Sequence, residues 1–251
     1  MRTHLNILLL IFLGHQAICA TIDSTRQNRK FHIGILVSPD YSYRVTTSTG
    51  GFTDIVNSLM DESDKPKVGL SIGSIIRIKL TANLNLTSGL LISNKGFKNK
   101  QENLTYGSMI DQRNGFVYSN NTSDLPSGAV FRFNHMYLDV PIAASYSINI
   151  SDKSKIHFAL GCALNCWLTN IKYGKLIYSG GKKTRSWTKY PYSDRQINLS
   201  PQLGLSYETS ICKNYILQVG PEYRRQIFST NNAPISNYFW TLGLNTVFLF
   251  K

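Results

Sequence analysis

The sequence predicts an all-β fold, an eight-stranded antiparallel up-and-down transmembrane β-barrel with short periplasmic turns and long extracellular loops. Three observations predict it: apolar and polar residues alternate along several segments, the connections between these segments alternate between long and short, and the polar faces carry few charges. Alternation with a period of two places apolar and polar side chains on opposite sides of a strand. Short turns at one end and long loops at the other are typical of membrane barrels.

The segment 196–209 shows the alternation most clearly, because apolar residues from Ile197 to Tyr207 alternate with polar residues from Asn198 to Glu208. Five other segments carry the same pattern, and two further segments, 31–44 and 84–97, bring the total to eight. We therefore expect eight strands, at 31–44, 67–80, 84–97, 135–149, 155–169, 196–209, 215–228 and 237–250.

The connections between these expected strands hold 22, 3, 37, 5, 26, 5 and 8 residues by subtraction, so long and short alternate. A soluble sandwich has no reason to sort its loops in this way. The polar faces are rich in Gly, Ser, Asn and Gln, which suits a crowded barrel interior better than a water-facing surface. Pro141, Pro201 and Pro221 fall inside strands and remove ladder donors, so we expect β-bulges there.

The N-terminal region has the features of an export signal. Arg2 and His4 precede an apolar run at 5–13 and a small-residue segment that ends at Ala20. The apolar run is too short to span a bilayer as a helix, and the whole pattern is typical of a secretory signal peptide. We expect a signal peptide at 1–20, cleaved after Ala20 or before Cys19, and a barrel domain at 21–251. The expected location is the outer membrane, with both termini in the periplasm.

Charged residues on the predicted polar faces form the first candidate site. They are Arg77, Lys79, Asp139, Glu208, Glu222 and Arg224. Opposite charges in a narrow interior should pair, because an unpaired buried charge is costly. An eight-stranded barrel is only wide enough for its own side chains. The sequence therefore favours a structural ion-pair network in the lumen, with a gated pore or a proton path as the alternative.

A basic, aromatic segment at 170–195, expected to be a loop, forms the second candidate site. Its chief members are Lys172, Lys175, Lys182, Lys183, Arg185, Trp187 and Lys189. The formal net charge of +13 points to an anionic partner, and export argues against nucleic acid. We expect the partners to be outer-membrane lipid and lipopolysaccharide phosphates, together with an envelope protein complex. A merely solvated loop is the alternative.

Several short segments carry a family resemblance. Residues 31–44 (FHIGILVSPDYSYR), 88–97 (SGLLISNKGF) and 137–142 (YLDVPI) resemble the PorT-like outer-membrane β-barrel family of Bacteroidota-type Gram-negative bacteria, and 200–207 and 220–224 fit the same pattern. The resemblance covers most of the chain after the predicted signal peptide. It implies an eight-stranded outer-membrane barrel, and the family's named member is similar to a component of a protein secretion and gliding apparatus.

The expected function is that of a non-enzymatic outer-membrane barrel, structural or part of an envelope or secretion assembly. One alternative is a lipid-modifying enzyme using His135 or His157, although neither lies in a GxSxG motif. The other is a soluble exported barrel that binds a small apolar ligand and keeps its apolar faces inside. The sequence has no Walker loop, HExxH or paired CxxC, so we expect no catalytic residues, cofactor or metal ligands.

Overall fold

The computed structural model describes residues 30–48, 54, 58, 60, 62–104, 109–110, 117–118, 125–178, 180–189, 195–212, 214–231 and 235–250. The predicted signal peptide at 1–20 lies outside these residues. The described strands are β1 (Phe31–Ser48), β2 (Asp64–Lys65), β3 (Lys67–Lys79), β4 (Leu84–Glu102), β5 (Met109–Ile110), β6 (Val117–Tyr118), β7 (Pro126–Ser151), β8 (Ser154–Tyr178), β9 (Lys183–Lys189), β10 (Ile197–Cys212), β11 (Tyr215–Arg225) and β12 (Ile235–Phe250).

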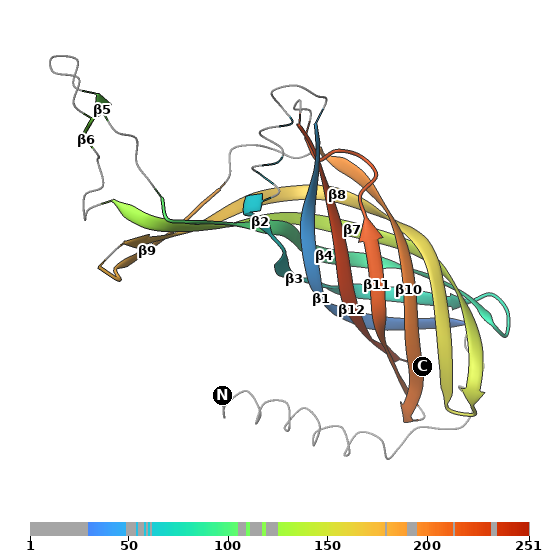
Figure 1. Ribbon diagram of the computed structural model, residues 1–251. Helices are drawn as coiled ribbons and strands as arrows, with labels where there is room; N and C mark the ends of the chain where they lie inside the picture. Colours follow the sequence, from blue (N-terminus) through green and yellow to red (C-terminus); the bar gives the residue numbers. More distant parts are fainter. Residues whose placement is uncertain are drawn as a thin grey trace.

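Eight antiparallel strands form a closed ring, which confirms the predicted fold class (Figure 1). The order around the ring is β1, β3, β4, β7, β8, β10, β11 and β12, and β12 pairs back onto β1. Closure removes the exposed edges that an open sheet would present. Each strand that the alternation predicts is present, and β7 and β8 continue well beyond their predicted bounds of 135–149 and 155–169.

The strands are staggered around the ring. The path of paired residues that starts at Phe31 passes through one residue of each strand and returns to β1 at Tyr41, ten residues further along. The partners on this path are Ile78, Leu86, Ala144, Leu160, Leu203, Tyr223 and Leu242. A stagger of this kind tilts the strands and fixes the barrel radius.

The outer surface of the barrel is apolar and the interior is polar. Val68 is 72% exposed, Leu160 69% and Leu203 60%, whereas Ser38, Ser71 and other inward-facing polar side chains are fully buried. A water-soluble barrel shows the reverse arrangement, so the structure rejects the soluble, ligand-binding alternative. Among the described residues, no helix has the length and apolar character needed to cross a membrane.

The loop rhythm is also confirmed. The tight connections after β3, β7 and β10 lie at one end of the barrel, together with the first and last described residues, Lys30 and Phe250. We call this the short-turn end. The connections after β1, β4, β8 and β11 lie at the other end, which we call the long-loop end.

The predicted bulges at the prolines are wrong. Pairing between β4 and β7 is interrupted at Pro141 and pairing between β10 and β11 at Pro221, but the register is the same on both sides of each gap. Pro201 stays paired with Cys162. Each proline lacks one hydrogen-bond donor to the neighbouring strand, but no residue is inserted to form a bulge. A strand that is paired on both sides tolerates one missing donor. The register shifts in β7–β8 lie instead between Pro126 and Gly128, between Met136 and Tyr137, and between Asn149 and Ser151.

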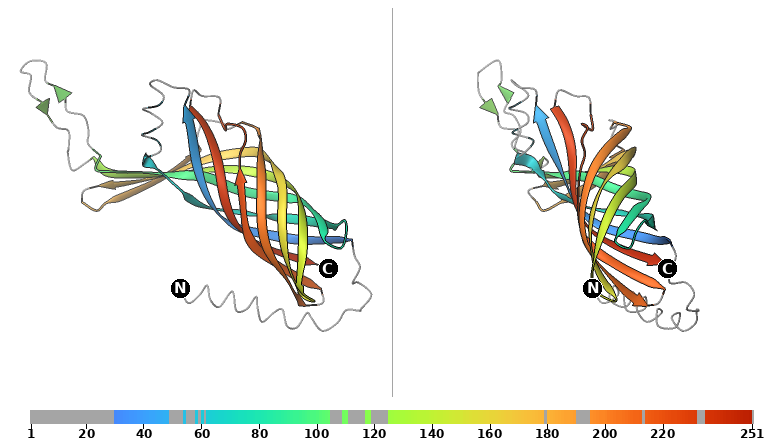
Figure 2. Two further views of the ribbon diagram at one scale, coloured as in Figure 1. Left: turned by 45° about the vertical axis from the view of Figure 1, so that its right-hand side comes forward. Right: turned by 90° about the vertical axis from the view of Figure 1, so that its right-hand side faces the viewer.

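Beyond the barrel, the ends of three strands continue as a single-layered sheet. Residues 97–102 of β4, 128–135 of β7 and 170–178 of β8 remain paired, and β9 adds to β8 as the edge strand. We call this extension the blade. It projects sideways from the long-loop end (Figures 1 and 2). The predicted loop at 170–195 is therefore wrong over most of its length, because its alternating residues keep pairing as a hairpin.

Candidate functional site in the lumen and on the blade

Arg224 of β11 lies at the centre of the larger charge cluster in the lumen. One nitrogen of its guanidinium, Nη2, lies 2.9 Å from Asp40 Oδ1 of β1. Nε lies 3.3 Å from Glu222 Oε1, and Nη1 lies 3.8 Å from Asp139 Oδ2 of β7. Lys95 Nζ of β4 lies 3.1 Å from the same Asp139 oxygen. This central cluster links four strands through five charged groups.

Neutral polar side chains complete the central cluster. Ser38 Oγ donates a hydrogen bond to Asp40 Oδ1 at 2.8 Å, and Ser71 Oγ donates to the other carboxylate oxygen. Asn165 Nδ2 donates to Asp139 Oδ1 at 2.7 Å, and Ser200 Oγ donates to Asn165. Buried ion pairs are tolerated when further hydrogen bonds satisfy their remaining lone pairs. The cluster therefore acts as a cross-link between strands rather than as a set of exposed charges.

A smaller charge cluster lies nearer the short-turn end. Arg77 Nη1 of β3 lies 2.5 Å from Glu208 Oε2 of β10, and His157 Nε2 lies 3.1 Å from the same oxygen. Arg77 Nη2 also donates to Gln218, whose amide nitrogen donates to Ser206. These contacts join β3, β8, β10 and β11 across the lumen.

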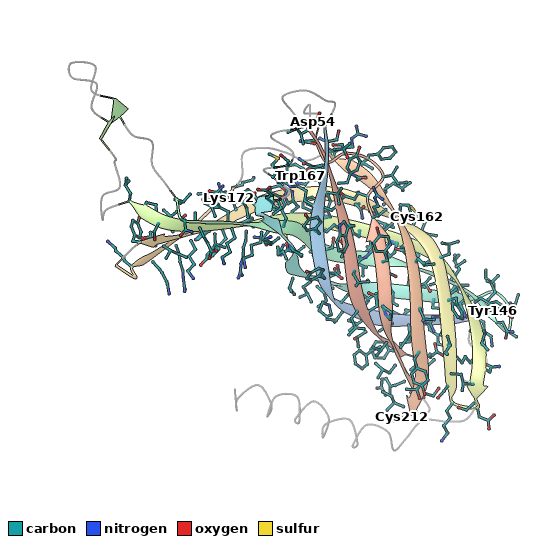
Figure 3. The ribbon with its side chains drawn as sticks, in the orientation of Figure 1. Asp54, Tyr146, Cys162, Trp167, Lys172 and Cys212 are labelled. Carbon is teal, nitrogen blue, oxygen red and sulfur yellow. The ribbon has the colours of Figure 1, made fainter. Side chains whose placement is uncertain are left out.

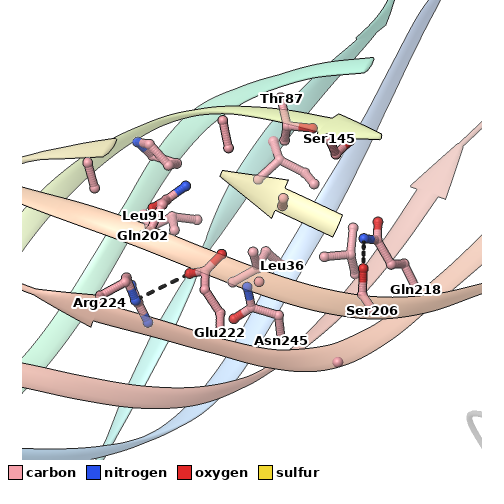
Figure 4. Close-up of a pocket in the computed structure, with 18 of the residues that line it drawn as sticks. Leu36, Thr87, Leu91, Ser145, Gln202, Ser206, Gln218, Glu222, Arg224 and Asn245 are labelled. Atoms are coloured by element: carbon pink, nitrogen blue, oxygen red, sulfur yellow. Dashed lines mark hydrogen bonds and ion pairs between the residues drawn. The ribbon is translucent and has the colours of Figure 1, made fainter. Parts of the chain in front are cut away.

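Between the two clusters the lumen is filled by apolar and small side chains. The buried apolar cluster comprises Leu36, Ile75, Leu91, Ile216, Val247 and Leu249. Beside it lies a cavity of about 80 Å³, whose lining includes Ala143, Ala163, Gly204 and Gly220 and residues of both charge clusters (Figure 4). A cavity of this size accommodates a few water molecules but not a metabolite.

The structure brings five of the six predicted lumenal residues into these two clusters. Arg77 and Glu208 form a pair, and Asp139, Glu222 and Arg224 meet in the central cluster. Lys79 does not join them, because it is the last residue of β3 and lies exposed at the short-turn mouth.

The sequence reasoning missed three members of the lumenal clusters, Asp40, Lys95 and His157. Asp40 and Lys95 belong to predicted strands, at 31–44 and 84–97, that were not divided into faces. Asp40 shares its face with Ser38 and Ser42, which is the signal that could have found it. His157 was considered as a candidate for the lipid-modifying enzyme and not as part of the charge network.

The blade has one strongly basic face. Residues paired across neighbouring antiparallel strands point to the same side of a sheet. One row runs Lys65, Lys98, Arg132, Tyr173 and Trp187 across five strands. The next row runs Lys100, Val130, Lys175 and Arg185. The two end pairs between β8 and β9 add Lys183 and Lys189 to the same face. Figure 3 shows nitrogen-tipped side chains gathered along one side of the blade.

The basic face therefore holds eight cationic side chains: Lys65, Lys98, Lys100, Arg132, Lys175, Lys183, Arg185 and Lys189. Glu102 is the one acidic residue on this face within the described strands, and its carboxylate lies 2.6 Å from Lys100 Nζ. Trp187 is 77% exposed beside these cations.

The opposite face of the blade is nearly uncharged. It carries Thr184, Ser186 and Thr188 on β9, and Phe131 and Phe133 on β7. Its one cation within the described strands is Lys172, whose Nζ lies 4.2 Å from the ring centre of Phe131 and 5.4 Å from that of Phe133. The blade is thus basic on one side and neutral on the other.

The predicted basic residues divide accordingly. Lys175, Lys183, Arg185, Trp187 and Lys189 lie together on the basic face. Lys172 lies on the opposite face, and Lys182 lies in the turn before β9, with its Nζ 5.9 Å from the ring centre of Tyr178. The sequence reasoning missed Lys65, Lys98, Lys100 and Arg132, because only the sheet register brings them beside the hairpin.

Residues 23–220 match the family described as outer membrane protein beta-barrel domain, and the chain belongs to this family. Two of the similar solved structures are Neisserial surface protein A, at 11% identity and a TM-score of 0.45, with 89% of this chain and 97% of that one covered, and the Escherichia coli outer membrane protease OmpT, at 11% identity and 0.40, with 92% and 100% covered.

A third similar structure is the attachment invasion locus protein Ail of Yersinia pestis, at 11% identity and a TM-score of 0.33, with 87% of this chain and 99% of that one covered. A search of the curated proteins finds no match to the sequence. The chain is an outer-membrane β-barrel protein, and the family assignment sets its location in the outer membrane.

Proposed function

We propose that this chain is a closed, non-enzymatic outer-membrane barrel that serves as a component of an envelope assembly. The observation that carries the proposal is the filled lumen, in which two charge clusters and an apolar cluster cross-link the strands. In this proposal, residues 1–20 direct export, the short-turn end faces the periplasm, and the long-loop end faces outward. Short periplasmic turns and longer external loops are the rule for bacterial barrels of this kind.

The lumen supports a structural rather than a conducting role. A pore needs a continuous wet path, whereas here Arg224 lies within 4 Å of carboxylates from three residues. Opening such a path would separate buried, oppositely charged groups, which is costly. The enzyme alternative has less support, because His135 and His157 both lie buried inside the barrel, away from the lipid-facing surface.

The blade supports a role in an assembly. Its edge strand β9 is exposed along its full length. An exposed edge leaves backbone N–H and C=O groups available to pair with a strand from another chain. The resemblance to the PorT-like family, whose named member is similar to a secretion-apparatus component, points the same way.

A conductance measurement tests the closed lumen. The purified chain, inserted into a planar bilayer, is expected to show no steady open-channel current. A variant with Arg224→Ala and Glu222→Ala, which removes the side chains that fill the lumen beside the cavity, serves as the comparison. Steady single-channel steps from the unmodified chain would contradict the proposal.

Two measurements on native membranes test the remaining claims. On a native gel, the chain extracted in mild detergent is expected to migrate in a complex much larger than the monomer. Migration as a monomer would contradict the assembly role. Deleting the gene is expected to leave the lipid A structure unchanged by mass spectrometry, and altered lipid A would instead support the lipid-modifying enzyme.

A further inference from the structure

The basic face of the blade continues the lipid-facing surface of the barrel. On β4, Leu90 and Ile92 are 53% and 48% exposed on the outer surface, and Lys98 and Lys100 follow on the same side of the strand. On β8, Leu164 and Leu168 are exposed on the outer surface. The register shift between Met136 and Tyr137 then brings Lys175, further along the strand, onto the same side. An apolar surface that turns basic at its edge matches the passage from lipid tails to headgroups.

The cations of this face also oppose one another within the sheet. Lys98 is paired with Lys65 on one side and with Arg132 on the other, and Lys175 is paired with Arg185. Like charges directly opposite each other destabilise a sheet. A ligand that supplies several negative charges would relieve this repulsion, and no other described acid besides Glu102 lies on this face.

The size of the face decides between kinds of anion. Eight cations are spread over β2, β4, β7, β8 and β9, and neighbouring strands lie about 4.8 Å apart. A single inorganic phosphate would contact only a small part of this array. An ordered layer of phosphorylated headgroups presents several phosphates at once, and Trp187 beside the cations suits the interface between lipid and water.

We propose that the basic face of the blade lies against the membrane and binds the phosphate groups of lipids in the leaflet at the long-loop end. Lys98, Arg132, Lys175 and Arg185 form its centre and contact the phosphates, while Trp187 contacts the headgroup region. This inference rests on the proposed orientation of the barrel. It gives a function to the basic face and leaves the neutral face and the β9 edge available to a protein partner.

Binding of lipid A to the full chain in neutral mixed micelles tests the proposal. The blade variant carries K98Q, R132Q, K175Q and R185Q. The control variant carries K153Q, K155Q, K172Q and K182Q, which removes the same charge from positions off the basic face. We expect the blade variant to bind lipid A at least about tenfold more weakly than the unmodified chain, and the control to stay within about twofold.

Three results of the binding experiment would overturn the proposal: equal loss in both variants, no loss in the blade variant, or displacement of lipid A by inorganic phosphate at an equal phosphate concentration. Heat-modifiable migration on a gel confirms beforehand that both variants fold as barrels. Orientation is measured separately with Ser186→Cys, which a membrane-impermeant maleimide should label in intact cells. Labelling only after the outer membrane is opened would overturn the proposal, whereas channel activity would overturn the proposed function and leave the binding difference intact.

Discussion

The lumen and the blade use charged side chains in opposite ways. Five buried cations, Arg44, Lys67, Arg77, Lys95 and Arg224, lie inside the barrel with the five carboxylates of Asp40, Asp64, Asp139, Glu208 and Glu222. On the basic face of the blade, eight cations accompany one carboxylate. The formal net charge of +13 is therefore carried outside the lumen.

This difference shows which charges hold the fold and which are available for recognition. A buried charge must be compensated within the protein, because no solvent reaches it. An exposed cluster of one sign stabilises nothing by itself and gains energy only when an anion arrives. Substitutions in the lumen should therefore reduce stability, and substitutions on the blade should change binding.

The largest expected effect follows from removing a lumenal carboxylate. Asp139→Ala leaves Lys95 and Arg224 without one of their carboxylate partners in the central cluster. We expect the free energy of unfolding to fall by about 3–5 kcal/mol, the usual cost of breaking a buried ion pair. Urea unfolding of the barrel in phospholipid vesicles measures it.

The blade supplies the matched control for this substitution. The Lys100–Glu102 pair is 43% and 68% exposed, so Glu102→Gln should cost less than about 1 kcal/mol. Similar losses for Asp139→Ala and Glu102→Gln would contradict the distinction between structural and exposed charges.

The next largest effect concerns close packing in the lumen. A Cβ at Gly220 would lie 2.0 Å from the carbonyl oxygen of Leu205, whereas a Cβ at Gly204 would meet its nearest atom at 3.6 Å. Gly220→Ala should therefore lower the free energy of unfolding by about 1–3 kcal/mol, as overpacking does. Gly204→Ala on the neighbouring strand should cost far less in the same urea titration. Equal losses would show that the interior is looser than its contacts indicate.

Alternation and loop length were sufficient to predict the barrel from the sequence. They place Ile197 and Glu208 on opposite faces of one strand without any knowledge of its neighbours. The partners of the lumenal charges could not be predicted from the sequence. The contact between Asp40 and Arg224, for example, joins residues 184 positions apart and depends on the register of the closed ring. For the same reason, only half of the cations on the basic face could be predicted from the sequence. Lys175 and Arg185 lie within one hairpin, but Lys98 and Arg132 reach it through the sheet.

The smallest expected effect is a gain in stability from a substitution on the blade, opposite in sign to the losses expected in the lumen. Arg185→Glu replaces a like-charge pair with an ion pair opposite Lys175 on the blade. In neutral detergent this variant should gain about 0.2–1 kcal/mol in free energy of unfolding, because cross-strand repulsion becomes attraction. In vesicles that contain lipid A the gain should shrink or reverse, since the variant loses a phosphate contact. Urea titrations in both media measure the difference. An equal gain in both media would mean that Arg185 meets no phosphate, and that the basic face carries a charge cost without a lipid ligand.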